Sequence, residues 1–222
     1  MSVEMRRGIT PKVLTGEYIV DRWPRLFHMA EAGSWPAIEA CGLLSTSALL
    51  DLYGIHGECR FLLESARRAE SARIDHPRYG PAWIRDNRPI NETVLKRTLV
   101  GMSEPEFYRL LNCRVFLWLT ELRLNKLRDA PLYRERQHDI LVVSTARLMS
   151  AYADQIELSP MNSGAVHAGA KVARGEGTFS RIRDYPWAQR VKVASAEPIV
   201  EVTVPYAIPD VSRFVVDVRE RQ

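Results

Sequence analysis

Two periodicities of hydrophobic and polar positions run along the 222-residue chain, one typical of strands and the other of helices. Apolar or alternating runs predict strands in five segments: 17–29, 114–120, 138–145, 199–206 and 213–218. Apolar positions at helical spacing predict helices in six segments: 34–42, 48–54, 57–74, 103–111, 120–130 and 146–155. Segment 94–101 fits a strand or a short helix. Because strands and helices do not alternate in a regular βαβ rhythm, we predict an α+β fold with mostly antiparallel pairing.

Capping residues mark the ends of several predicted helices. Ser34 can cap a short helix that ends at Gly42. Ser103 and Glu106 have the spacing of a capping box. The Ser-Thr-Ser triplet at 45–47 has no nucleophile elbow around it, so we expect its hydroxyls to cap the helix that follows rather than to act in catalysis.

A histidine follows the first apolar run. In segment 17–29, extended backbone would place Leu26 and His28 on one face and Phe27 and Met29 on the other. We therefore expect His28 at the end of a strand, immediately before a turn into a helix. The residues alone leave two interpretations open, a satisfied structural histidine or a ligand-binding group.

A glutamate interrupts the most regular strand pattern, IVEVTV at 199–204. The alternation predicts two sets of residues on opposite faces, Val200, Val202 and Val204 against Ile199, Glu201 and Thr203. Glu201 then lies either on a solvated face or in a cleft, and the pattern does not decide between these.

Length and composition describe an ordinary globular chain, with 46% hydrophobic and 26% charged residues. We expect one domain over 1–222 with its core at about 18–218, and an exposed connection or lid at 73–92, which is rich in Pro and Arg. No run reaches the length of a membrane helix, and MSVEMRRGIT lacks the apolar region of a secretory signal. Three widely spaced cysteines favour a reduced, cytoplasmic compartment.

Charge and motifs narrow the candidate chemistry. The net charge of +4 permits an anionic partner without requiring one. The chain has no P-loop and no HExxH, and ARGEGTF at 173–179 lacks the third glycine of a dinucleotide fingerprint. Five histidines stand apart in the sequence, so we expect no metal site.

Four segments together carry a resemblance to a known family. RLFHMAEAGSWPAIEACGL, from residue 25, contains a predicted strand with His28, then a helix and Gly-Leu. LNCRVFLWLTELRLNKL, from residue 111, contains an aromatic strand, and HDILVVSTARLM, from residue 138, contains a strand and a helix. PIVEVTVPYAIPDV, from residue 198, contains a late strand with Glu201. Their order over residues 25–218 resembles that of ADP-ribosyltransferases, closest to the DNA-modifying DarT-type toxins and more distantly to the RNA 2′-phosphotransferases. The central strand RVFLWLT departs from the Pro-containing run of DarT-type enzymes, so the acceptor is not carried over.

A second resemblance rests on shorter elements. Gly-Leu-Leu-Ser-Thr at 42–46, Asn-Ser-Gly at 162–164 and Arg-Gly-x-x-Thr-Phe at 174–179 are similar to an uncharacterised bacterial family related to these enzymes. Membership of that family brings no activity with it.

The resemblance to ADP-ribosyltransferases implies a split, mostly antiparallel sheet with surrounding helices, and NAD as co-substrate. Cleavage of the nicotinamide–ribose bond passes through an oxocarbenium-like state, which the carboxylate of Glu201 would stabilise. His28 would bind a ribose hydroxyl, and backbone near Met29, Gly42 and Leu43 would meet the nicotinamide amide.

Two further assignments stay open between function and structure. Arg114 either pairs a phosphate of NAD or pairs an acidic side chain at a strand end. The polar segment before the catalytic strand either selects the acceptor or is an ordinary surface loop; its candidate residues are Asn162, Ser163, Arg174 and Thr178.

Three functions compete on this basis. The first is transfer of ADP-ribose to a nucleic acid or protein by a bacterial toxin or defence enzyme, which an antitoxin would restrain. The second is an RNA 2′-phosphotransferase-like enzyme, which needs a second basic pocket and has Arg85 and Arg88 as its clearest cluster. The third is a non-catalytic nucleotide- or nucleic-acid-binding domain of the same fold.

Overall fold

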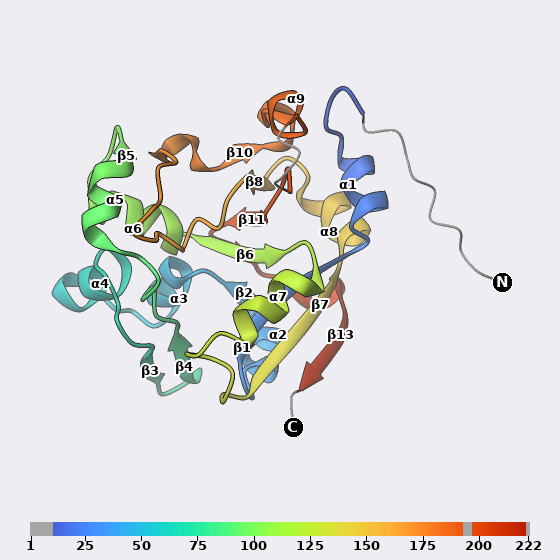
Figure 1. Ribbon diagram of the computed structural model, residues 1–222. Helices are drawn as coiled ribbons and strands as arrows, with labels where there is room; N and C mark the ends of the chain where they lie inside the picture. The colour runs from blue at the N-terminus through green and yellow to red at the C-terminus, as the bar shows by residue number, and fades with distance from the viewer. Residues whose placement is uncertain (1–10, 193–196, 221–222) are drawn as a thin grey trace.

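The computed structural model describes residues 11–192 and 197–220. These residues form nine α-helices and a mostly antiparallel seven-stranded sheet, together with three two-stranded sheets (Figure 1). The α+β class and the mostly antiparallel pairing predicted from the sequence are therefore confirmed. The N-terminal segment 1–10, considered above for a signal, lies outside the described residues.

The central sheet has the strand order β10-β8-β11-β6-β1-β7-β13. Its strands are β1 Arg25–Glu31, β6 Arg114–Trp118, β7 His138–Ser144, β8 Glu157–Ser159, β10 Ser180–Arg181, β11 Glu201–Pro205 and β13 Val215–Glu220. The predicted runs at 114–120, 138–145 and 199–206 contain β6, β7 and β11, and the run at 213–218 overlaps β13, which continues to Glu220.

The sheet is nearly divided in its middle. Strands β1 and β7 pair at seven positions and β11 and β6 at five, but the described pairing between β1 and β6 is a single position, Phe27 opposite Trp118. Beyond this point β1 and β6 separate, so one half of the sheet is β10-β8-β11-β6 and the other is β1-β7-β13. Backbone groups along the opening need partners from outside the sheet.

Helices surround the sheet, with α1 and α8 side by side at the right of Figure 1 and α3 to α6 at its left. The α-helices are α1 Gly16–Arg22, α2 Trp35–Cys41, α3 Thr46–Leu52, α4 Gly57–Glu64, α5 Glu92–Thr98, α6 Glu104–Asn112, α7 Glu121–Arg128, α8 Thr145–Tyr152 and α9 Trp187–Arg190. The remaining strands are β2 Leu43–Leu44, β3 Ala72–His76, β4 Gly80–Ile84, β5 Leu99–Val100, β9 Arg174–Gly175 and β12 Ala207–Ile208. Single 3₁₀ turns lie at Glu176–Thr178, Ile182–Asp184 and Val211–Arg213.

The two faces of the sheet are buried in different clusters. Val202 and Val204 join the largest cluster, which includes residues of α8. Phe27 and Met29 pack on the other face with Leu124 of α7. The period-two alternation of β11 thus places its valines in one core and Glu201 on the opposite face.

Two parts of the first predicted strand are different in the structure. Residues 16–22 form the helix α1, because Thr15 caps its N-terminus by accepting a hydrogen bond from the amide of Tyr18 at 3.2 Å. The strand begins only after Pro24 and runs on to Glu31, so His28 lies in the middle of β1 rather than at its end.

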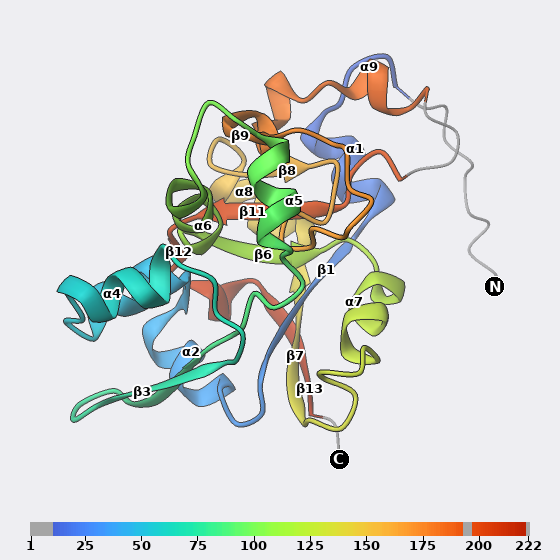
Figure 2. The same cartoon turned by 60° about the vertical axis from the view of Figure 1, so that its left-hand side comes forward.

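The helix predicted at 57–74 is too long, and the region that follows it contains two strands that were not predicted. The predicted helix 57–74 ends at Glu64, and the expected connection or lid at 73–92 is mainly the antiparallel hairpin of β3 and β4 (Figure 2). Ile74 and Ile84 of this hairpin are buried in a small cluster with Leu50 of α3. That cluster anchors the hairpin, which a reading of its Pro and Arg content alone did not foresee.

Candidate functional site: a pocket at the opening of the sheet

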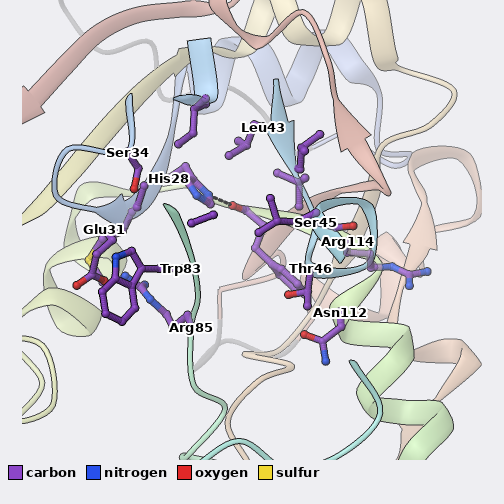
Figure 3. A pocket seen from close by; sticks show the side chains of 18 of the residues that line it. His28, Glu31, Ser34, Leu43, Ser45, Thr46, Trp83, Arg85, Asn112 and Arg114 are labelled. Carbon is purple, nitrogen blue, oxygen red and sulfur yellow. Dashed lines mark hydrogen bonds between the residues drawn. The ribbon is translucent and has the colours of Figure 1, made fainter. Parts of the chain in front are cut away.

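A pocket of about 490 Å³ lies where β1 separates from β6. Its wall comes from both halves of the sheet, from the β1–α2 turn, from the β3–β4 hairpin and from the loop residues Asn162, Gly164 and Ala165 (Figure 3). Among the residues that line it are His28 and Glu201. The volume is within the range of small-molecule sites, roughly 300–1,000 Å³.

His28 bridges the opening between the two halves. Its Nδ1 lies 2.9 Å from the carbonyl oxygen of Phe116 in β6, the bond drawn in Figure 3. Because a carbonyl only accepts, Nδ1 carries the proton and donates, and Nε2 remains an acceptor. The imidazole thus replaces a backbone amide that the separated strand no longer supplies, and its other nitrogen is available to a ligand.

The environment of His28 keeps it neutral. The pKa of His28 is lowered to about 4, chiefly by desolvation and in smaller part by the charge of Arg85, while the hydrogen bond to Phe116 acts in the opposite direction. At neutral pH the ring therefore carries no charge, and Nε2 can accept a hydrogen bond from a hydroxyl group.

Glu201 occupies the first position of β11. It pairs with Trp118, which in turn pairs with Phe27, so Glu201 is two strands away from β1, or about 10 Å at the spacing of neighbouring strands. Its side chain is only 3% exposed. Its two carboxylate oxygens lie 3.3 and 3.2 Å from the backbone nitrogen of Ser163, which donates to them. Glu201 is therefore in a cleft, and the solvated face left open by the sequence is excluded.

Burial also decides the charge of Glu201. Desolvation raises the pKa of Glu201 to about 7, against the hydrogen bonds from Ser163 and the positive charges of Arg123 and Arg174, which lower it. The carboxyl group is thus close to half-ionised at neutral pH. A titratable group of this kind in a pocket is typical of functional sites.

The turn between β1 and α2 forms one wall and is held by an aspartate. The carboxylate of Asp139 in β7 accepts hydrogen bonds from the amides of Gly33 at 3.1 Å and Trp35 at 2.9 Å. Ser34 occupies the N-cap position of α2 but makes no side-chain capping bond, so the role predicted for its hydroxyl belongs to Asp139. The sequence signal was an acidic residue inside the apolar run of β7.

Gly42 and Leu43 continue this wall, as does Met29, whose side chain is buried. Gly42 has a φ of 88°, and a Cβ there would lie 2.5 Å from the Cα of Pro209. Leu43 pairs with Ile208 in the same region. Gly42 is therefore required for the close approach of the segment after β12, whatever its backbone does for a ligand.

Arg114 is already engaged by protein groups. It forms an ion pair with Glu157 at 2.8 Å and donates to the carbonyl of Leu110 at 2.6 Å. Its guanidinium also lies over the ring of Phe179, and it points away from His28 in Figure 3. Of the two roles left open by the sequence, the structure favours the pairing with an acidic side chain.

The loop before β11 divides into two parts. Asn162 is exposed and lines the pocket, and Ser163 binds Glu201 through its amide. Arg174 and Thr178 are buried away from the pocket wall: Arg174 donates to the carbonyls of Val172 and Ala165, and Thr178 accepts from the amide of Gly175. These two residues hold the loop together and do not contact the pocket.

The hairpin of β3 and β4 also contributes to the pocket, and this contribution was not predicted from the sequence. Trp83 and Arg85 line the pocket, and Arg85 stacks on the ring of Tyr133 at 5.0 Å. The hydroxyl of Tyr133 donates to Asp86 at 2.9 Å. Alternation in ARIDH and GPAWI, on either side of a turn at residues 77–79, was the signal that could have revealed this strand pair.

Three general findings complete the description. In the part of the chain that the structure covers, no three His, Cys, Asp or Glu side chains gather as a metal site. No helix in residues 11–192 or 197–220 has the length and apolar character needed to cross a membrane. Cys41, Cys59 and Cys113 are free thiols.

Fold and site together define the class: an α+β protein with a divided antiparallel sheet and a small-molecule pocket that a neutral histidine and a buried glutamate both line. Over residues 24–215 the chain matches, and belongs to, the family described as Family of unknown function (DUF7002). A comparison with curated proteins finds no match to this chain.

Proposed function

We propose that this protein is an NAD-dependent ADP-ribosyltransferase. One observation carries the proposal: His28 and Glu201, on strands that flank β6 in a sheet that opens at this point, line the same pocket. The sequence resemblance assigns these same two residues to the ribose and to the developing positive charge.

The chemistry assigns a separate task to each residue. Nε2 of His28 accepts a hydrogen bond from a ribose hydroxyl and so positions the sugar. As the bond between ribose C1′ and the nicotinamide nitrogen breaks, the ionised carboxylate of Glu201 stabilises the oxocarbenium-like sugar. Neutral nicotinamide leaves, the acceptor forms its bond to C1′, and the acceptor's proton passes to Glu201.

The acceptor in this proposal is a nucleic acid or a protein. The net charge of +4 suits a nucleic acid, and a toxin of this kind would have an antitoxin partner. Three free cysteines support a reduced, cytoplasmic location. An RNA 2′-phosphotransferase is less well supported, because Arg85 lines the pocket whereas the exposed Arg88 is not among its lining residues.

Incubation with NAD labelled in its adenylate phosphate tests the proposal. DNA, RNA and lysate protein are supplied together, then separated and counted. We expect one fraction to retain label with the wild-type protein and none to retain it with Glu201→Gln. Glu58→Gln, at an exposed glutamate in the first turn of α4, is the matched control and should still label. If no fraction is labelled and no nicotinamide is released, the proposal is wrong.

A further inference from the structure

One guanidinium in the pocket wall has no acceptor. The guanidinium of Arg85 makes no hydrogen bond and no ion pair with any described side chain or carbonyl, and it lies over the ring of Tyr133 at 5.0 Å from the ring centroid. A guanidinium has five N–H donors, and one that is partly removed from water without acceptors is unfavourable. The other arginines of the pocket wall, Arg68 and Arg114, are fully engaged by carbonyl or carboxylate oxygens.

Neighbouring residues fix the backbone and the guanidinium plane of Arg85 but supply no hydrogen-bond acceptor for its N–H groups. Arg68 donates to the backbone carbonyl of Arg85 from Nε at 3.1 Å and from Nη2 at 3.0 Å, which fixes the chain at the end of β4. Tyr133 supports the guanidinium plane, and its own hydroxyl is held by Asp86. A charged group fixed in this way is ready to bind without further ordering.

The nearby carboxylates do not neutralise Arg85 at contact distance. Glu31 and Asp86 act on it through their charge but form no ion pair with it among the described residues. Asp86 already accepts hydrogen bonds from the hydroxyls of Tyr133 and Ser71 and from the amide of Arg88. Glu31 lines the pocket on the same side as Arg85 in Figure 3, so its charge opposes an anion there.

We propose that Arg85 binds a phosphoryl group of the ligand that fills this pocket. The planar guanidinium suits two phosphoryl oxygens at once, which an ammonium does not. The inference rests on the proposed function in one respect, since it assigns the phosphoryl group to the diphosphate of a dinucleotide. Arg85 shares the pocket with His28, so the diphosphate and the ribose would be bound in one cavity.

Calorimetric titration with inorganic pyrophosphate and with ADP-ribose tests the inference without turnover, because neither compound has a nicotinamide to release. We expect Arg85→Gln to lower the affinity for pyrophosphate and for ADP-ribose by about tenfold or more. Arg88→Gln removes the same charge from an exposed position nearby and should change affinity by less than about twofold. Glu31→Gln should strengthen binding of both. If Arg85→Gln does not fold, Arg85→Lys is used instead. It should still weaken binding, because an ammonium cannot donate to two phosphoryl oxygens in the bidentate geometry of a guanidinium.

The outcomes separate this inference from the proposed function. Equal binding by wild type and Arg85→Gln, or an equal loss in Arg88→Gln, overturns the role of Arg85 even if NAD is cleaved. Pyrophosphate binding that depends on Arg85 supports the inference even if no nicotinamide is ever released.

Discussion

His28 and Glu201 are two titratable residues of one pocket wall, and burial shifts both toward their neutral forms. The pKa of His28 is lowered to about 4, far from neutrality, whereas that of Glu201 is raised to about 7. The same physical cause, desolvation, therefore leaves His28 uncharged at neutral pH and brings the pKa of Glu201 close to neutral pH.

The difference follows from what each group contacts. His28 donates from Nδ1 to a carbonyl oxygen, and the neutral imidazole can make this hydrogen bond without taking up a second proton. Glu201 accepts only from the amide of Ser163, and the guanidiniums of Arg123 and Arg174 act on it from a distance. The comparison teaches that a histidine can serve as a fixed hydrogen-bonding group while a neighbouring carboxylate supplies the charge.

The largest expected effect comes from removing the charge of Glu201. Glu201→Gln keeps the size of the side chain and an oxygen for Ser163 but cannot ionise. We expect kcat for nicotinamide release to fall by about 10²- to 10³-fold, the usual loss when transition-state charge stabilisation is removed. Release of nicotinamide by Glu58→Gln should stay close to that of the wild type.

Removing the imidazole should have a smaller effect. His28→Ala takes away the acceptor that we propose for the ribose and leaves the carbonyl of Phe116 without the imidazole donor. We expect kcat/KM to fall by about tenfold to a hundredfold, together with some loss of stability. His56→Ala, at an exposed histidine, serves as control, and the comparison between His28 and Glu201 breaks down if both variants behave alike.

The pH dependence should report Glu201 alone. Activity is expected to rise about tenfold between pH 6 and pH 8, because ionisation of a group with a pKa of about 7 increases by that factor. His28, with a pKa of about 4, contributes no step in this range. A pH–rate profile of kcat/KM measures this directly, and a flat profile would contradict the account.

The smallest effect is on stability, and its sign is opposite to that on activity. The pKa of Glu201 rises from 4.5 to about 7 on folding, so its favourable contribution is present below pH 4.5 and is lost as the pH rises through 7. Glu201→Gln should therefore be more stable than wild type at pH 8, by on the order of 1–3 kcal/mol, and close to it at pH 4.5. Urea unfolding at both pH values measures the difference in free energy of unfolding. A variant that is less stable than wild type at pH 8 would show that the ionised carboxylate of Glu201 does not destabilise the folded protein.

Much of the fold was predictable because its strands are long runs with clear periods. The strands containing Arg114–Trp118 and His138–Ser144 were identified from local pattern, and so was the capping box of Ser103 and Glu106. Helix α1 was missed because Trp23 and Pro24 suggested extended backbone, a local preference that ends at Trp23 and does not reach back to Thr15.

The site was predictable only in part. His28 and Glu201 were identified as candidates, and the structure places both in the pocket wall. Arg85 was named only as part of a basic cluster with Arg88, and Asp139 was assigned no role, because their roles depend on contacts between segments far apart in the chain, such as Arg85 with Tyr133 or Asp139 with Gly33. Such contacts follow from the packing of the hairpin and of β7, which no local pattern encodes.

The most direct test of the account is NAD binding to Glu201→Gln, which should retain ligand without turning it over, with and without His28→Ala. Calorimetry should show NAD bound at one site per chain in Glu201→Gln, and at least about tenfold weaker binding in the double variant. If Glu201→Gln does not bind NAD, or if the double variant binds it equally well, His28 and Glu201 do not act on one dinucleotide in this pocket.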